Sequence, residues 1–270
     1  MADAKPTGAE SLPLPDRSEA DLPGHWLLAR LGKRVLRPGG LELTSRLLSS
    51  AHIAGADVVE LGPGLGRTAS DIVALAPRSY VGVDDTAAAT DAVRSIVSPV
   101  DGAVVVADAA QTGLPSGCAD VVVGEAMLTM QSDKAKRAIV AEAFRMLRSG
   151  GRYAIHELGL EPDTMPQEVK DEIRRDMARA IKVNARPLTT AEWTALLDEA
   201  GFEVVSVDHA PMALLNPARV LADEGLVGAL RILGNLIRRP AARRRVVGMR
   251  RTFHRYRHSL TAVALVGVVP

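Results

Sequence analysis

Residues 57–68 read Asp-Val-Val-Glu-Leu-Gly-Pro-Gly-Leu-Gly-Arg-Thr, and this stretch decides the fold. Its first five residues form a short, largely apolar run that predicts a buried strand. Gly62, Gly64 and Gly66 follow at alternate positions, and a helical pattern begins at residue 67. Glycine lets the backbone approach a ligand closely, and the start of a helix offers unpaired N–H groups to an anion. The stretch therefore predicts a strand, a ligand-binding loop and a helix in immediate succession.

The same alternation of apolar runs and helical patterns extends along most of the chain. Strands are expected over 57–61, 80–84, 103–107, 120–124, 151–158, 202–215 and 260–268. Because these strands are nearly continuously apolar and are mostly separated by helices, we expect a doubly wound, mostly parallel seven-stranded sheet with helices on both faces. The fold class is therefore α/β, with ligands bound at the carboxyl ends of the strands.

The remaining segments are expected to belong to one domain that runs from residue 24 to 270. Residues 1–23 are rich in Pro and acidic side chains and are expected to form a flexible tail. N-terminal helices are expected over 24–53, a lid-like segment over 161–187, and a basic helical insertion over 217–258 before the last strand.

Charge is unevenly distributed along the 270 residues, although the formal net charge is only +1. No Asp or Glu follows Glu224, whereas ten arginines do, so the preceding residues carry a net charge of −9. The basic part fits either an anionic partner or a solvated surface that neutralises the acidic remainder. The near balance of charge over the whole chain excludes a general polyanion binder.

Three further features bound the cellular setting and the chemistry. A single cysteine, Cys118, excludes an internal disulfide and a multi-cysteine metal site. No apolar run reaches the length of a membrane span, and residues 1–24 lack the apolar segment of a signal peptide. We therefore expect a cytoplasmic protein without a metal ion.

The glycine spacing departs from a dinucleotide-binding fingerprint, which needs a small residue where Arg67 stands. The pattern Glu60-x-Gly62-x-Gly64-x-Gly66 resembles instead the first motif of class I S-adenosylmethionine-dependent methyltransferases. Further matches follow in the family's order: Asp84 ends the second strand, Asp108 follows the third, and Leu147–Arg152 precedes the fifth, with Ser149 in place of the usual Pro. The resemblance covers about residues 37–215. Arg37-Pro38-Gly39-Gly40 is similar to a turn in small-molecule, ubiquinone/menaquinone-type members.

This resemblance implies S-adenosyl-L-methionine as the cofactor, S-adenosyl-L-homocysteine as a product, and an antiparallel last strand. It places Asp84 on the ribose hydroxyls, with Asp85 equally placed, and Asp108 on the adenine amine. The full set of expected cofactor-binding residues is Gly39, Gly40, Glu60, Gly62, Gly64, Gly66, Asp84, Asp85, Asp108, Ala109 and Glu125. Their structural alternatives are capping of loop amides or of the next helix, and formation of tight turns.

Candidate general bases lie at the ends of the fourth and fifth strands, over the expected pocket. They are Glu125, His156 and Glu157, and the first two are the catalytic candidates. Histidine titrates near pH 7, which suits proton transfer. Strand alternation sends His156 and Glu157 to opposite faces, so we expect only one of them to reach a substrate. A hydrogen-bonded structural histidine is the alternative.

A small, apolar methyl acceptor is the first hypothesis for the reaction. The methionines in segments expected around the opening are Met127, Met130, Met165, Met177 and Met212. Methionine adapts to irregular apolar ligands, although core filling is its commoner use. The alternatives are transfer to nucleic acid or protein through the Arg-rich insertion, and a non-catalytic cofactor-binding regulator. With two Trp, three Tyr and three Phe, the chain is poor in residues that stack on a flipped base.

The insertion also carries an apolar helical face, formed by Leu226, Val227, Leu230, Leu233 and Ile237. Four roles stay open for this face. It covers the substrate pocket, packs on the sheet, contacts a second subunit in a homodimer, or touches a membrane with the arginines at the headgroups.

Overall fold

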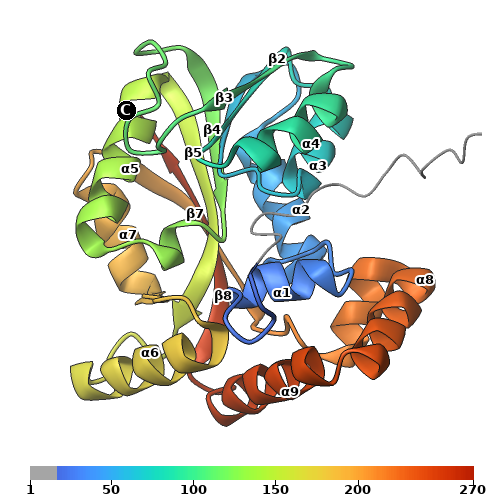
Figure 1. The fold of residues 1–270 in the computed structure, drawn as a ribbon. Coiled ribbons are helices and arrows are strands. Elements are labelled where there is room, and N and C mark those ends of the chain that lie inside the picture. Colours follow the sequence, from blue (N-terminus) through green and yellow to red (C-terminus); the bar gives the residue numbers. More distant parts are fainter. Residues whose placement is uncertain (1–16) are drawn as a thin grey trace, which may run out of the picture.

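The computed structural model describes residues 17–270 and is built on one mixed β-sheet (Figure 1). The strands are β1 Asp57–Leu61, β2 Ser79–Asp84, β3 Asp101–Val106, β4 Ala119–Glu125, β5 Leu147–Leu160, β7 Glu203–Pro211 and β8 Leu260–Val268. Their order is β3-β2-β1-β4-β5-β8-β7, with β1 to β5 parallel and β8 antiparallel between β5 and β7. The predicted α/β fold and its antiparallel last strand are confirmed. A two-residue strand that was not expected, β6 Leu188–Thr189, pairs with β5.

Helices cover both faces of the sheet, as the continuously apolar strands predicted. One face carries α2 Gly40–Ala51, α3 Arg67–Ala74 and α4 Ala87–Val97, and the other carries α5 Asp133–Met146 and α7 Thr190–Asp198. Successive side chains of a strand point to opposite faces. Val121 and Val123 of β4 therefore pack in the cluster under α2 to α4, while Val122 packs in the cluster under α5 and α7.

The remaining helices gather at the end of the sheet where β5 ends, away from the C-terminus (Figure 1). They are α1 Gly24–Arg30, α6 Gln167–Ile181, α8 Pro217–Arg238 and α9 Pro240–Arg255. The expected lid-like segment contains α6, and the expected insertion is a helical hairpin whose first helix bends at Gly225. Within the described residues, no helix combines the length and apolarity needed to cross a bilayer.

The described part of the expected tail, residues 17–23, packs against this hairpin. Leu22 is fully buried, and the guanidinium of Arg245 donates hydrogen bonds to the carbonyl oxygens of Glu19 and Leu22. This differs from the expectation of a flexible segment up to residue 23. The rest of the expected tail, residues 1–16, lies outside the described residues.

Candidate active site

The glycine loop after β1 has the backbone conformation that only glycine adopts readily. Gly62, Gly64 and Gly66 have φ values of 69°, 54° and 73°. A Cβ atom on Gly66 would overlap the terminal methyl group of Ile96 on α4, so a larger residue there would require this side chain to move. A Cβ atom on Gly62 or Gly64 would meet no atom closer than 3.5 Å. The first two glycines therefore leave open space above the loop, as a ligand cradle requires.

Three predicted acids lie at the same edge of the sheet, namely Glu60 on β1, Asp84 at the end of β2 and Asp108 just beyond β3. Asp84 ends β2, and its carboxylate accepts hydrogen bonds from the N–H of Gly64 (3.1 Å) and of Thr86 (2.9 Å). Asp84 is thus buried and tied to the glycine loop, whereas Asp85 is exposed. The side chain of Asp108, two residues beyond β3, is exposed at the same edge.

Asp108 and its neighbour Ala109 form a turn beyond β3. The carboxylate of Asp108 accepts a hydrogen bond from the N–H of Ala110 at 2.8 Å, and Ala109 is half-buried. The fold therefore brings Asp84 and the Asp108 turn to the same edge of the sheet as the glycine loop. Their contacts with a cofactor stay predictions.

Glu60 lies beneath the loop, almost without contact with solvent. Its Oε2 accepts a hydrogen bond from the Tyr80 hydroxyl at 2.7 Å, and the residue is 2% exposed. Burial disfavours the charged form and raises the pKa of Glu60 to about 8. The carboxyl group is therefore largely protonated at pH 7 in the cofactor-free protein.

Glu125, at the end of β4, is surrounded by hydrogen-bond donors. Its Oε2 lies 3.0 Å from Nε of Arg37 and accepts a hydrogen bond from the Thr68 hydroxyl (2.6 Å). Its Oε1 accepts hydrogen bonds from the Thr44 hydroxyl (2.5 Å) and from Nδ1 of His156 (2.9 Å). Burial alone would raise its pKa, but the charge of Arg37 and the bond from His156 lower it to about 2. Three hydrogen bonds and the ion pair with Arg37 thus engage both carboxylate oxygens, which makes Glu125 a poor base for a substrate proton.

His156 also has both ring nitrogens engaged. The imidazole is fully buried; its Nδ1 faces Glu125, and its Nε2 accepts a hydrogen bond from the N–H of Gly39 at 3.0 Å. A Cβ atom on Gly39 would lie 3.0 Å from Nε2 and 2.5 Å from Cδ2 of Leu43, so packing explains this glycine. The arrangement matches the structural alternative for His156, which fastens the Arg37–Gly40 turn to β5.

Glu157 points away from His156, as the alternation of the strand predicted. Its carboxylate accepts hydrogen bonds from the N–H groups of Met127, Leu128 and Thr129, at 3.0, 2.7 and 3.0 Å. The Thr129 hydroxyl adds a fourth at 2.6 Å. Glu157 therefore fixes the loop after β4, where the 3₁₀ turn Leu128–Met130 lies.

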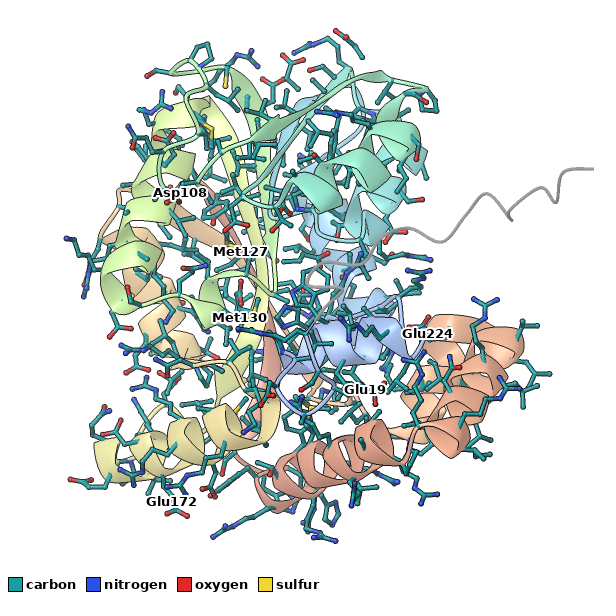
Figure 2. All side chains as sticks on the ribbon, in the orientation of Figure 1. Glu19, Asp108, Met127, Met130, Glu172 and Glu224 are labelled. Carbon is teal, nitrogen blue, oxygen red and sulfur yellow. The ribbon has the colours of Figure 1, made fainter. Side chains whose placement is uncertain are left out.

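Two acids of α8 that sequence reasoning missed bind the backbone on either side of the Arg37–Gly40 turn; Figure 2 labels one of them, Glu224. Glu224 accepts hydrogen bonds from the N–H groups of Arg34 and Val35, each at 2.9 Å. Asp223 accepts one from Leu41, and a Cβ atom on Gly40 would lie 2.9 Å from its Oδ1. The sequence held one signal for them, since they are the last two acids before the acid-free stretch.

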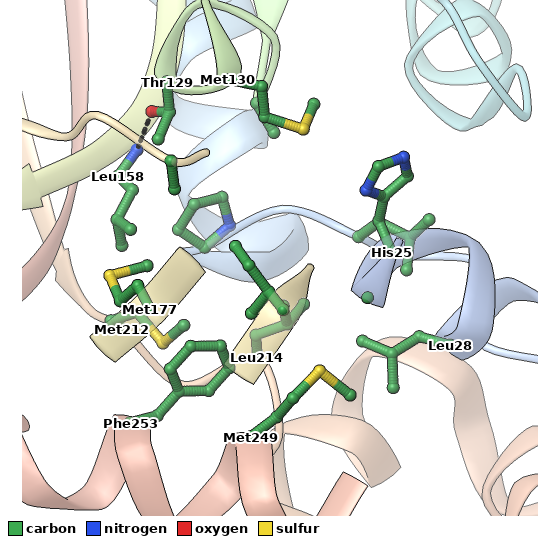
Figure 3. Close-up of a pocket in the computed structure, with 16 residues that line it drawn as sticks. His25, Leu28, Thr129, Met130, Leu158, Met177, Met212, Leu214, Met249 and Phe253 are labelled. Atoms are coloured by element: carbon green, nitrogen blue, oxygen red, sulfur yellow. Dashed lines mark hydrogen bonds between the residues drawn. The ribbon is translucent and has the colours of Figure 1, made fainter. Parts of the chain in front are cut away.

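An apolar pocket of about 110 Å³ lies between α1, α6, α9 and the loop after β4 (Figure 3). Its apolar side chains are Leu28, Leu36, Pro38, Ala126, Met130, Leu158, Met177, Ile181, Ala185, Met212, Leu214, Met249 and Phe253. Met130, Met177 and Met212 were expected near the opening, whereas Met249 of α9 was not. Met127 and Met165 are buried in neighbouring parts of the core.

His25 is one of two polar side chains in this pocket, together with Thr129. Its ring contacts Trp26, with the centroids 4.8 Å apart. No described residue makes a hydrogen bond to the nitrogens of His25, which Figure 3 shows among the residues that line the pocket. Burial lowers the pKa of His25 to about 4, so the imidazole is neutral at pH 7. Sequence reasoning missed this residue because nothing local distinguishes a histidine on the first turn of α1.

Comparisons with known proteins agree with this geometry. Residues 58–151 match a family described as a methyltransferase domain. An uncharacterized protein of Haemophilus influenzae is 32% identical over 90% of this chain and 96% of its own length. A probable S-adenosylmethionine-dependent methyltransferase of Mycolicibacterium smegmatis is 34% identical over 56% of this chain and 53% of its own.

A crystal structure of an S-adenosylmethionine-dependent methyltransferase from Thiobacillus denitrificans, in complex with S-adenosyl-L-homocysteine, shares the fold. The TM-score is 0.64 at 16% identity, over 93% of this chain and all of that chain. At this identity the likeness is one of fold.

Proposed function

The chain belongs to the class I S-adenosylmethionine-dependent methyltransferase family, and we propose that it transfers a methyl group to a small, apolar acceptor held in the pocket of Figure 3. S-adenosyl-L-methionine is the cofactor. When bound at the glycine loop, this cofactor supplies a methyl group that the adjacent sulfonium makes electrophilic. The chain's task is then to hold the acceptor in line with that group and to keep water out.

We place the cofactor at the edge of the sheet where the glycine loop, Asp84 and Asp108 lie. The space over Gly62 and Gly64 admits a ligand against the backbone, and Asp84 is fixed beside it by the N–H of Gly64. We assign the ribose hydroxyls to Asp84 and the adenine end to the turn at Asp108. Glu60 supports the loop from below.

One observation carries the acceptor assignment: the apolar pocket adjoins this edge. Two of its lining residues, Pro38 and Ala126, are the immediate neighbours of Gly39 and Glu125. Apart from His25 and Thr129, the pocket presents only carbon and sulfur side chains. No described arginine of the insertion lines it, which favours an apolar small molecule over nucleic acid or protein.

His25 is the residue we assign to the reacting polar group of the acceptor. Its neutral imidazole lines the apolar pocket without a hydrogen bond from a described residue, so a ring nitrogen is free to accept a hydrogen bond from a polar group of the acceptor. If the acceptor atom carries a proton, His25 takes this proton as the carbon–oxygen or carbon–nitrogen bond forms and the carbon–sulfur bond breaks. Glu125 and His156, which pair with one another, position the Arg37–Gly40 turn instead.

Calorimetric titration with S-adenosyl-L-methionine and S-adenosyl-L-homocysteine tests the cofactor site. Asp84→Ala is expected to weaken both affinities by at least about tenfold, because two charge-assisted hydrogen bonds are lost. Asp101→Ala, at an exposed aspartate that begins β3, is the matched control. Undiminished affinity in a folded Asp84→Ala protein would remove Asp84 from the site.

Transfer of labelled methyl groups to a panel of apolar hydroxyl, quinone-like and amine acceptors tests the pocket. His25→Ala is expected to slow transfer by about a hundredfold without changing cofactor affinity. His25→Asn keeps a hydrogen-bond acceptor but cannot take a proton, so it should restore acceptor binding but not the rate. His258→Ala, at an exposed histidine, is the control. Full turnover by His25→Ala would refute the assignment.

A further inference from the structure

The first helix of the insertion presents a continuous apolar face to solvent. Leu226, Val227, Leu230, Leu233 and Ile237 of α8 are between 53% and 71% exposed. Their spacing places them on one side of the helix after its bend at Gly225. This set of five is called the α8 face. Isolated exposed apolar residues are ordinary, but five on one helical face require an explanation.

The opposite side of α8 is already packed on the body of the protein. Ile232 is 9% exposed and lies against Gly32, and Nδ2 of Asn235 donates a hydrogen bond to the carbonyl oxygen of Leu31 at 3.0 Å. The α8 face therefore does not pack on the sheet. None of its five residues lines the apolar pocket either. Two of the four roles expected from the sequence are thus wrong for this face.

The hairpin of α8 and α9 is also strongly basic. Its exposed arginines without a carboxylate within ion-pair distance, among the described residues, are Arg231, Arg238, Arg243, Arg244, Arg250 and Arg251. Arg239 and Arg255 do pair with acids, whereas residues 225–270 contribute none. Arg231 and Arg238 directly follow Leu230 and Ile237, so they border the α8 face.

We propose that this hairpin docks on an anionic lipid surface. The α8 face would enter the boundary between headgroups and acyl chains, with the bordering arginines on lipid phosphates. The apolar side chains match the acyl chains of such a surface, and the unpaired arginines match its phosphates. The proposal does not depend on methyl transfer.

A second copy of the chain fits this face less well. In a two-fold interface the same surface meets itself, so Arg231 and Arg238 of both copies would converge. No described acid lies among residues 225–238 to compensate their charge. Bringing like charges together costs free energy, whereas a phosphate-rich surface supplies the missing anions.

Sedimentation of the full chain with vesicles tests the proposal. Vesicles of phosphatidylcholine alone are compared with vesicles that also contain phosphatidylglycerol. We expect binding to the anionic vesicles, weakened by added salt because the arginine contacts are screened. The paired substitution Leu230→Gln with Leu233→Gln should weaken binding at least about tenfold, while Gln preserves helix propensity. Arg231→Gln with Arg238→Gln should weaken it in a salt-dependent way.

Matched controls separate docking from loss of fold. Val169→Gln changes an exposed aliphatic on α6, and Arg137→Gln changes an exposed arginine on α5; both should bind vesicles like the parent protein. Circular dichroism of each variant monitors folding. Equal binding to neutral and anionic vesicles, no binding to either, or unchanged binding by the Leu230→Gln, Leu233→Gln protein would overturn the proposal. A dimer in analytical ultracentrifugation that this variant dissociates would assign the face to a second copy.

Discussion

Replacing Glu60 by Gln should stabilise the cofactor-free protein by about 3 kcal/mol at pH 7. Glu60 is 2% exposed, and burial raises its pKa from 4.5 to about 8. The folded protein therefore holds a proton on this carboxyl group at neutral pH, while the unfolded chain releases it. Gln carries no charge and keeps an oxygen for the hydrogen bond from Tyr80.

The magnitude follows from proton linkage. Between pH 4.5 and about pH 8, the folded state binds one more proton than the unfolded state at Glu60. The free energy of unfolding then falls by about 1.4 kcal/mol for each pH unit of increase. Because pH 7 lies about 2.5 pH units above the ordinary value, the accumulated cost is about 3 kcal/mol. At pH 5 the same reasoning gives less than about 1 kcal/mol.

Urea unfolding of both proteins at pH 5, 6, 7 and 8 measures this difference. Only the difference between the two proteins isolates Glu60, because other groups titrate in the same range. The lowered pKa of His25, about 4, acts with the opposite sign: stability rises with pH between about 4 and 6.5. Glu168→Gln, at an exposed glutamate, is the control. A difference between parent and Glu60→Gln that stays constant from pH 5 to 7 would refute the reasoning.

Three further substitutions test the loops around the site. Gly66→Ala should lower the free energy of unfolding by about 2 kcal/mol, because its φ of 73° is unfavourable and its Cβ would overlap Ile96; an unchanged Tm would contradict this. Arg37→Gln should cost about 3–5 kcal/mol, because Glu125 loses its buried cation. The low pKa of Glu125 should then rise, so acid unfolding should begin at higher pH, and an unshifted acid transition followed by circular dichroism would argue against that coupling. Glu157→Gln replaces one acceptor oxygen by a donor and should cost about 2 kcal/mol, with faster hydrogen exchange over 127–129 as the measurement and unchanged protection as the contrary result.

Local patterns were sufficient for most of the fold. The strands over 57–61 and 260–268 have the predicted bounds, because a short apolar run flanked by turn residues encodes both the conformation and its ends. The fifth strand extends to Leu160, two residues beyond its predicted end, and β6 was missed. Both depend on pairing at the end of the sheet, which no local periodicity records.

The glycine loop could also be predicted from the sequence. The left-handed conformation of its glycines is a local property, and the acids of β1, β2 and β3 follow from the rule that parallel strands end at one edge. The hydrogen-bond partners of the expected catalytic residues could not be predicted from the sequence. Gly39 and His156 are 117 residues apart, and Thr44 and Glu125 are 81 apart.

The sequence by itself thus determined the α/β fold, the ligand-binding loop and the resemblance to methyltransferases, since each rests on residue types at short spacing. Only the tertiary structure decided that Glu125 and His156 satisfy one another, that His25 reaches the apolar pocket, and that the α8 face points to solvent. The physical reason is that the tertiary contacts decide which polar atoms keep a free lone pair and which helix faces stay exposed to solvent. Those contacts join segments that are distant in the sequence, and short-range patterns do not specify them.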